Sequence, residues 1–346
     1  MKKIILLVCI AVICFSCKRV YQPRSIENIS IKTFKIDSTS IRAIHPLSET
    51  AVLFAGSKGI IGFTADDGVT WHKDTIVYQD SIVPSFRSIA SNLSETFVLS
   101  VGNPALLYKV TNEEMKLVYT ESHEKVFYDS MAFFDAKNGI AIGDPTDNCA
   151  SIILTADGGN TWTKMACEKA PLLSKGEAFF AASNTNIAIV KNTVWLATGG
   201  TKARVLKSSD KGQTWEVFET PIIQGNGPQG IYSIDFYDEN NGIIMGGNFL
   251  KPTENKANKA ITKDGGKTWT LVAKGQNPSY KSSVQYVPNT NGKEIFAVGK
   301  TGISYTNDGG ITWKEVSTES YYAIQFVNPN VAWLSGHQKI GKLILK

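Results

Sequence analysis

Seven places in the sequence share a three-residue pattern, in which a variable residue precedes a small residue and then an apolar one. The variable residues are Arg42, Arg87, Asp129, Glu177, Tyr232, Ser282 and Tyr322. Arginine presents a planar fork of N–H donors that matches a carboxylate or a phosphate. The pattern therefore predicts a group of side chains that binds an anionic ligand or the C-terminal carboxylate of a partner. The alternative is a buried structural ring in which the two arginines pair with the two carboxylates.

The arginines are few, and their positions agree with the first interpretation. Arg19 and Arg24 precede residue 29, and Arg204 follows an inserted loop. We expect Arg204 to lie on the same face of the molecule as Arg42 and Arg87. The predicted ligand-binding set is Arg42, Arg87, Arg204, Asp129, Glu177, Tyr232 and Tyr322.

A repeated motif identifies the elements that must position these side chains. The pattern Ser/Thr-x-Asp-x-Gly-x-Thr-Trp occurs at residues 64–71, 155–162, 208–215, 262–269 and 306–313. Its carboxylate can accept hydrogen bonds from N–H groups of a tight turn, and its glycine can supply a positive φ. Its tryptophan can bury a large ring between neighbouring units. The predicted structural aspartates are Asp66, Asp157, Asp210, Asp264 and Asp308.

The spacing of the motif gives the architecture. Successive aspartates are 91, 53, 54 and 44 residues apart, and the first step is close to two ordinary ones. The missing turn falls near residues 111–114, between the apolar runs 105–110 and 115–119. A period of about 40–50 residues with four strands in each unit is typical of a β-propeller.

We predict an all-β protein, a seven-bladed β-propeller spanning residues 29–346, with six blades as the alternative. The units begin near residues 41, 86, 128, 177, 231, 282 and 321. The segment 29–36 reads as a lone strand that completes the last blade and closes the ring, which removes exposed sheet edges. First strands surround the channel of a propeller. The seven variable residues of the three-residue pattern are therefore expected at the channel mouth, on the face opposite the repeated turns.

The N-terminus has the pattern of a targeting segment. Lys2 and Lys3 precede a short apolar run, which is too short to span a bilayer as a mature helix. Residues 14–17 resemble a loose bacterial lipobox, and we predict a signal peptide over 1–17 with a lipid on Cys17. An ordinary secretory signal is the alternative. Residues 18–28 would form a tether, and the 29–346 domain would lie in the bacterial cell envelope, on the periplasmic side or at the outer membrane.

Other residue types limit the function. Cys149 and Cys167 flank one repeated turn as near cross-strand neighbours, so they form either a disulfide or two unpaired thiols. We expect no metal site, because no histidine accompanies them, and no cofactor, because no nucleotide, haem or flavin motif occurs. A net charge of +5 without a dense basic cluster predicts no nucleic-acid surface. The domain is expected to be a monomer.

The repeated motif resembles the Asp-box, or BNR, repeat of β-propellers. Over nearly the whole mature chain, its glycine-rich copies behind a lipoprotein-type signal resemble the photosystem II assembly-factor (stability-factor) propellers. That resemblance implies a protein-binding module with an arginine-bearing face. A more distant resemblance to sialidases rests on Phe86-Arg87-Ser88-Ile89. It implies a carboxylate-binding triad of Arg42, Arg87 and Arg204, with catalytic roles for Asp129, Glu177, and Tyr232 or Tyr322.

Overall fold

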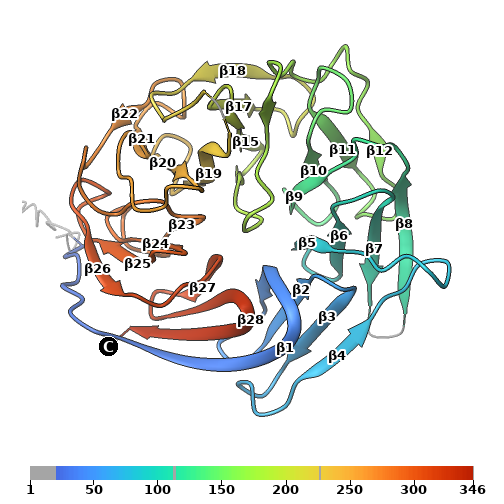
Figure 1. The fold of residues 1–346 in the computed structure, drawn as a ribbon, viewed down its shortest axis with the longest axis horizontal. Coiled ribbons are helices and arrows are strands. Elements are labelled where there is room, and N and C mark those ends of the chain that lie inside the picture. Colours follow the sequence, from blue (N-terminus) through green and yellow to red (C-terminus); the bar gives the residue numbers. More distant parts are fainter. Residues whose placement is uncertain (1–20, 112–113, 226, 346) are drawn as a thin grey trace, which may run out of the picture.

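A computed structural model describes residues 21–111, 114–225 and 227–345, and within them every regular element is a β-strand. The strands form sheets that stand around a central axis as a ring, with β5, β9, β19, β23 and β27 nearest the centre (Figure 1). The described part of the chain contains no helix with the length and apolar character needed to cross a membrane. The predicted all-β propeller is confirmed.

Four of the sheets have four strands each. The first contains β5 (Phe86–Ser91), β6 (Thr96–Ser100), β7 (Ala105–Val110) and β8 (Met115–Glu121). The second contains β9 (Tyr128–Phe133), β10 (Gly139–Gly143), β11 (Ser151–Thr155) and β12 (Thr163–Lys164). The third contains β14 (Ile187–Val190), β15 (Thr193–Ala197), β17 (Arg204–Ser208) and β18 (Glu216–Glu219). The fourth contains β23 (Ser283–Tyr286), β24 (Ile295–Gly299), β25 (Gly302–Thr306) and β26 (Lys314–Ser317).

Two sheets have six strands each. One contains β19 (Gln229–Phe236), β20 (Gly242–Asn248), β21 (Lys259–Thr262) and β22 (Thr270–Leu271), extended at the edge of β19 by β16 (Gly199–Gly200) and β13 (Glu177–Ala178). The other has the order β27 (Ala323–Asn328), β28 (Val331–Leu345), β1 (Ile29–Pro46), β2 (Val52–Gly56), β3 (Ile60–Thr64) and β4 (His72–Thr75).

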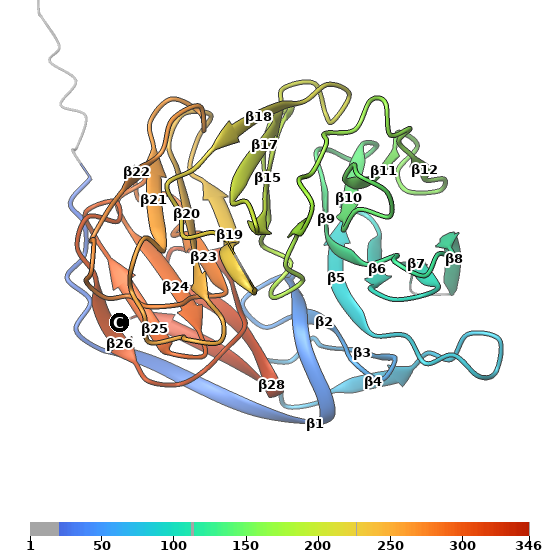
Figure 2. The ribbon, with the colours of Figure 1, turned by 45° about the horizontal axis from the view of Figure 1, so that its top comes forward.

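The described strands form six sheets, so the prediction of seven separate blades is wrong and the alternative of six matches the sheet count. The reason is that β1 is continuous and joins the first and last predicted units in one sheet. Its first half, Ile29–Lys35, pairs with Lys339–Leu345 of β28, and its second half, Ile41–Pro46, pairs with β2. Figure 2 shows β1 as a long strand that runs from beside β28 to beside β2.

The closing pairing itself agrees with the sequence, because the segment beginning at Ile29 does complete the sheet of the last unit. Within this sheet, β28 doubles back, since the N–H of Leu345 donates to the carbonyl of Asn330 at 2.9 Å and Gln338 has a φ of +54°. Antiparallel pairing of residues more than 300 positions apart therefore holds the two ends of the described chain together.

The five repeated turns share one hydrogen-bond pattern. In the first, the Thr64 hydroxyl donates to Asp66 at 2.8 Å, and the N–H and hydroxyl of Thr70 donate to the same carboxylate at 2.9 and 2.6 Å. The hydroxyl of Thr70, and then its N–H, lower the pKa of Asp66 to about 2. The same contacts recur at Asp157, Asp210, Asp264 and Asp308. These carboxylates are occupied in holding turns, as their spacing predicts.

Each of these turns also packs against the sheet that precedes it in the ring. Gly159 of the second turn lies so close to Phe97 on β6 that an added Cβ would meet the ring at 2.3 Å. Trp162 follows it and packs edge-on against Phe97, with ring centroids 6.2 Å apart. The turns therefore close the junctions between neighbouring sheets, and the apolar core is divided among these junctions.

The segment 21–28, expected to be part of a tether, contains no strand but lies against the ring. The guanidinium of Arg24 binds the carboxylate of Glu294 at 2.6 and 2.8 Å, and its carbonyl accepts from Tyr305 and Asn307 at 2.9 Å. Ile26 is buried among the apolar side chains of β24, β25 and β28. The predicted signal peptide and Cys17 lie outside the described residues.

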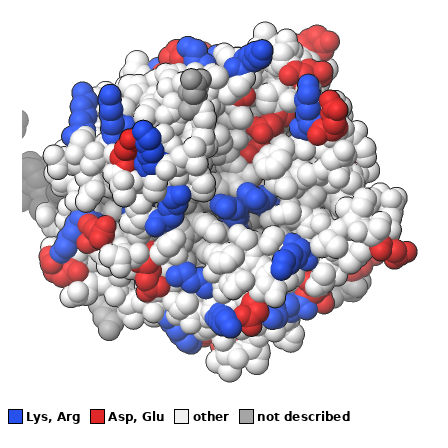
Figure 3. All heavy atoms as spheres, in the orientation of Figure 1, with Lys and Arg blue, Asp and Glu red and all other residues white. Residues whose placement is uncertain are grey.

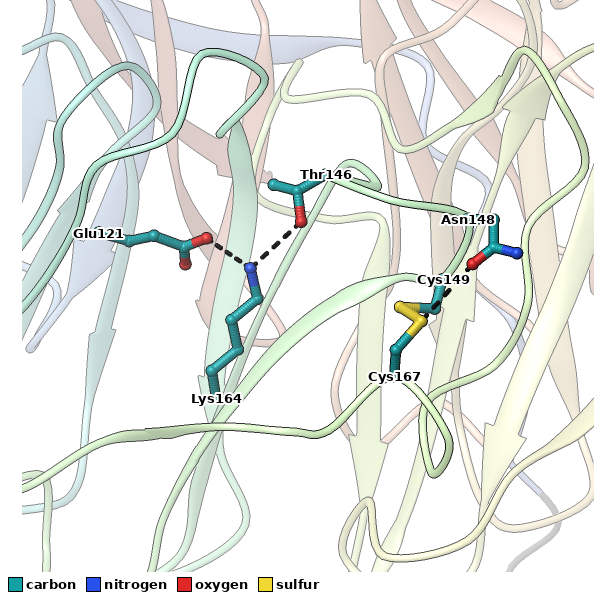
Figure 4. Close-up of a disulfide and its surroundings, with 6 residues drawn as sticks. All are labelled: Glu121, Thr146, Asn148, Cys149, Lys164 and Cys167. Carbon is teal, nitrogen blue, oxygen red and sulfur yellow. Dashed lines mark hydrogen bonds and ion pairs between the residues drawn. A yellow bond between two sulfur atoms is a disulfide. The ribbon is translucent and has the colours of Figure 1, made fainter.

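Cys149 and Cys167 form a disulfide across 5.7 Å between their Cα atoms. Near the turn Ile153 faces Lys164 and Leu154 faces Thr163, which brings Cys167 toward Cys149, although the backbone of Cys149 pairs with Leu172. Figure 4 shows the disulfide beside Asn148, with Lys164 reaching from β12 to Glu121 and Thr146. Of the two alternatives left open by the sequence, the structure has the disulfide.

Candidate functional site

The channel is filled from one side by the segment of residues 179–186, here called the channel segment. In Figure 1 this yellow-green part of the chain turns into the centre of the ring. Its polar groups reach the inner edges of several sheets. Ser183 donates to the Ser282 carbonyl at 2.6 Å, and Thr185 contacts Ser233 at 2.8 Å. Asn184 donates to Ile89 at 2.9 Å and accepts from the N–H of Met131 at 3.0 Å.

Arg42 and Arg87 lie at this mouth and bind the channel segment through carbonyl groups only. Arg87 donates to Ala181 at 2.8 Å, and Arg42 donates to Ala182 at 3.1 Å. The Arg42 guanidinium lies over the ring of Tyr322, 4.2 Å from its centroid. Its Nε is buried and has no hydrogen-bond partner. Figure 3 shows that the middle of the face drawn there is hollowed and carries basic side chains.

The two arginines act on each other electrostatically. Burial, and then the charge of Arg42, lower the pKa of Arg87 to about 10, and Asp129 acts in the opposite direction. Among the described residues neither arginine has a carboxylate within ion-pair distance. The alternative of a ring of ion pairs is therefore wrong for these two residues. They form a pair of like charges that an anion would stabilise.

Asp129 lies beside them but does not neutralise them by direct contact. It is fully buried, and neither of its carboxylate oxygens has a hydrogen-bond partner. Burial raises the pKa of Asp129 well above its usual value, the neighbouring Asp144 raises it further, and Arg87 opposes both. The N–H groups of Ala181 and Asp144 lie near enough to lower it slightly, although neither makes a hydrogen bond of good geometry.

Asp144, in the loop after β10, is a site residue that the sequence reasoning missed. Its carboxylate accepts from the N–H of Phe179 at 2.8 Å, at the start of the channel segment. Burial raises its pKa to about 6, and the Phe179 N–H acts in the opposite direction. Asp144 therefore fixes the position of the segment that the arginines also hold. The Asp-Pro step at the start of an inserted loop was the available signal.

Glu177 and Arg204 form a separate, neutralised pair. The guanidinium of Arg204 binds the carboxylate of Glu177 at 2.6 and 2.9 Å, and Thr198 and the N–H of Ser174 complete the carboxylate's partners at 2.7 and 2.8 Å. The Glu177 side chain is inaccessible to solvent. The predicted grouping of Arg204 with Arg42 and Arg87 is therefore wrong, because a buried carboxylate already satisfies it.

The alignment that placed Glu177 in the pattern explains this error. β13 pairs with β16 at the edge of a sheet, and the innermost strand of the fourth unit is β14, ten residues later. The sequence reads the residues after Glu177 as a first strand, whereas they form the channel segment. The step of 53 residues between Asp157 and Asp210, longer than the 44 of the last step, was the signal for this insertion.

Tyr232 packs and does not face a reacting group. It is buried, its hydroxyl donates to the Pro228 carbonyl at 2.8 Å, and its ring stacks on Phe180 with centroids 4.3 Å apart. Burial raises its pKa, and Arg42 lowers it. The hydrolase set inferred from sialidases is therefore not assembled: Arg204 and Glu177 are paired elsewhere, and Tyr232 is engaged. Asp129, Arg42, Arg87 and Tyr322 remain as the group at the channel mouth.

A cavity of about 1020 Å³ lies elsewhere, between the β1–β4 part of one sheet and the β5–β8 sheet, at the end of the ring that carries the repeated turns. Leu53, Ile61 and Phe63 line one wall, and Val98 and Val110 line the other. The sequence assigned no function to this face. The channel mouth and this groove are therefore two separate surfaces.

No protein-family model matches the chain, and no curated protein matches it. Solved structures do resemble it. A structure described as YCF48 bound to D1 peptide has a TM-score of 0.67 at 16% identity, covering 93% of this chain and 97% of that one. The streptogramin B lyase structure has a TM-score of 0.67 at 16% identity, covering 92% and 98%. The RRP9 WD40 repeats have a TM-score of 0.66 at 12% identity, covering 93% and 100%.

These likenesses show the fold alone, because the identities are low and the neighbours differ in what their names describe: a peptide-bound protein, a lyase and a repeat module. The propeller can serve each of these purposes. An argument about function must therefore rest on the residues at the channel mouth.

Proposed function

We propose that this protein is a partner-binding propeller that captures an anionic group at its channel mouth, either the C-terminal carboxylate of a protein or another anionic ligand. The observation that carries the proposal is the pair of Arg42 and Arg87. Each donates a hydrogen bond to a backbone carbonyl, and neither has an ion-pair partner among the described residues. A bound carboxylate would supply the countercharge that Glu177 supplies to Arg204.

The peptide in the structure of YCF48 supports a protein partner, because a protein of similar fold is described as peptide-bound. The repeated turns have the hydrogen bonds expected of an Asp-box. They support our inference that the chain has a role like that of the photosystem II assembly-factor propellers. In that role the protein would be an assembly or interaction module acting as a monomer.

The proposal includes an envelope location. Cys17 would carry a lipid and residues 18–28 would link it to the domain, on the periplasmic side or at the outer membrane. Since Arg24 is bound to Glu294, the free part of the linker would be short and would keep the domain close to the bilayer. Metabolic labelling with a palmitate analogue tests this: wild type should incorporate label and Cys17→Ser should not. Equal labelling of both would exclude the anchor.

The test of the binding proposal uses synthetic peptides with a free C-terminal carboxylate and the same peptides as C-terminal amides, titrated calorimetrically. The wild type should prefer the carboxylate form by about tenfold or more, and Arg42→Ala combined with Arg87→Ala should remove that preference. Lys211→Ala is the matched control, because it removes one positive charge near a repeated turn. Equal affinity for both peptide forms would contradict the proposal.

A further inference from the structure

The groove between the β1–β4 part and the β5–β8 sheet lies where one repeated turn is missing. In the other copies, the glycine and tryptophan of a turn cover the preceding sheet, as Gly159 and Trp162 cover Phe97. The β7–β8 connection begins at Thr111 and has no tryptophan. The facing residues on β2 and β3 therefore lack the tryptophan that covers their equivalents.

The walls of the groove carry apolar and polar side chains, and several of the apolar ones are open to solvent. Phe63 is 42% exposed, and Leu47 and Leu93 at its rim are 60% and 92% exposed. Phe63 is stacked on His72, with ring centroids 4.8 Å apart, so one of its faces is already held. Large exposed apolar side chains around a concave surface are typical of an interaction site. A volume of about 1020 Å³ accommodates several residues of a peptide.

A second junction also lacks a repeated turn, and there the protein supplies its own cover. Between β24–β25 and the β27–β28 part, the segment 21–28 lies in the junction in irregular conformation. Ile26 provides the buried apolar side chain, and Arg24 pairs with Glu294 on the wall. An open junction of this ring is thus filled by a strandless segment with one apolar anchor and a charged contact. The groove between the β1–β4 part and the β5–β8 sheet also lacks a repeated turn, and among the described residues no such segment fills it.

We propose that this groove binds an irregular segment of a partner protein, whose aromatic side chain takes the place of the absent tryptophan. The charges at the groove specify its neighbours. Asp74 on β4 lines one wall, and Lys116 on β8 and Glu114 just before it line the other; none of the three has an ion-pair partner among the described residues. Since the two unpaired carboxylates outnumber the unpaired lysine, the occupant carries a basic residue next to its aromatic anchor. This surface is separate from the channel mouth and does not depend on the proposed function there.

The probe is a fluorescein-labelled synthetic peptide with the sequence of residues 304–317, which presents a complete repeated turn with its tryptophan, Lys314 and Glu315. Fluorescence anisotropy with the full mature chain should show saturable binding. Binding should weaken by about tenfold or more when the peptide carries Trp313→Ala, since an aromatic anchor carries most of such an interface.

Two protein variants locate the site. Phe63→Ser removes the exposed ring, and Leu93→Glu places a charge at the rim on a side chain that is 92% exposed, so the second keeps the test valid if the first misfolds. Both should weaken the probe, whereas Leu250→Ser, which changes a leucine that is 72% exposed outside the groove, should not. Reversing the charge with Asp74→Lys should also weaken it.

Three outcomes would overturn the proposal. Equal binding of the tryptophan and alanine peptides would show that no aromatic anchor is recognised. Loss of binding only in the Arg42→Ala, Arg87→Ala protein would move the site to the channel mouth. A dimer in light scattering that Leu93→Glu dissociates would make a second copy of this chain the occupant.

Discussion

Arg204 and the pair Arg42 and Arg87 form two arginine sites that differ in how their positive charge is balanced. Arg204 is bound by the buried carboxylate of Glu177, whose remaining lone pairs are also occupied. Arg42 and Arg87 lie side by side with carbonyl groups as partners, near a buried carboxyl that accepts no hydrogen bond. The positive charge at the first site is neutralised by a carboxylate of the same chain, whereas among the described residues no carboxylate pairs with the arginines of the second. The availability of an arginine for a ligand thus depends on its partner in space and not on its place in a sequence pattern.

The largest expected effect separates the sites by stability. Arg204→Ala leaves Glu177 buried without its countercharge, which should cost about 3–5 kcal/mol in the free energy of unfolding. Urea denaturation measures this. Adding Glu177→Gln should recover part of the loss, because glutamine is neutral, its amide oxygen still accepts from the Ser174 N–H, and its NH2 group can donate to the Thr198 hydroxyl. A loss below about 1 kcal/mol for Arg204→Ala would remove the distinction between the sites.

At the open site the same type of change should cost much less. Arg42→Ala combined with Arg87→Ala removes two hydrogen bonds to carbonyls and one ring contact but also a repulsion, so the loss should stay below about 2 kcal/mol. The same denaturation experiment applies. If the double variant is destabilised as strongly as Arg204→Ala, the two arginines are structural and the binding proposal fails.

The dependence of stability on pH tests the burial of Asp144, the carboxyl beside the channel segment. The pKa of Asp144 is raised to about 6 in the folded protein, against about 3.9 in an unfolded chain. Protonated Asp144 therefore contributes to the stability of the folded protein below about pH 4. This contribution is lost as the pH rises from about 4 to 6. Asp144→Asn should abolish that loss, on the order of 3 kcal/mol, while keeping an acceptor for the Phe179 N–H.

Asp66→Asn is the control for this prediction, because the pKa of Asp66 is lowered to about 2. A lowered acid contributes stability above about pH 4, and loses it as the pH falls through 2. Its curve should therefore depart from that of the wild type across the plateau and converge with it only in strong acid. Parallel curves for Asp144→Asn and wild type between pH 4 and 6 would contradict the assigned burial.

The smallest effect tests geometry at constant charge. Arg42→Lys keeps the positive charge but loses the planar fork and the face that lies on Tyr322. Affinity for carboxylate peptides should fall by about two- to fivefold, measured by calorimetry, with stability nearly unchanged. Unaltered affinity would mean that the mouth attracts anions by charge alone.

Much of the fold followed from the sequence because its turns are chemically explicit. The aspartate, glycine and tryptophan of each repeat specify hydrogen bonds, backbone conformation and packing at once. Their spacing therefore located the missing turn between the runs 105–110 and 115–119, which form β7 and most of β8. The channel segment was not predictable in the same way. It follows Glu177-Ala178-Phe179, which fits the three-residue pattern of the inner strands, and only its tertiary contacts, such as those with Arg42 and Arg87, assign it to the channel.

The site was predicted in part for the same reason. Arg42, Arg87 and Tyr322 come from inner strands or their ends, whose pattern is regular, and the structure brings Arg42 onto Tyr322. Glu177 fits that pattern by residue type while lying in a different strand. The number of sheets was also not predictable, because nothing in the residues 36–40 indicates that β1 continues without a break from the last unit into the first.

The pairing of Ile29–Lys35 with Lys339–Leu345 has a consequence for the order of events during synthesis. On the order of 300 further residues must be synthesised before the partner of Ile29–Lys35 exists. This pairing can therefore form only late, although β1 is the first strand to be made. Until then the sheet that bears Arg42 lacks one of its edges, and Tyr322 has not been made. A nascent chain therefore has no complete channel mouth, and the proposed capture of a partner would be restricted to molecules whose synthesis has passed β28.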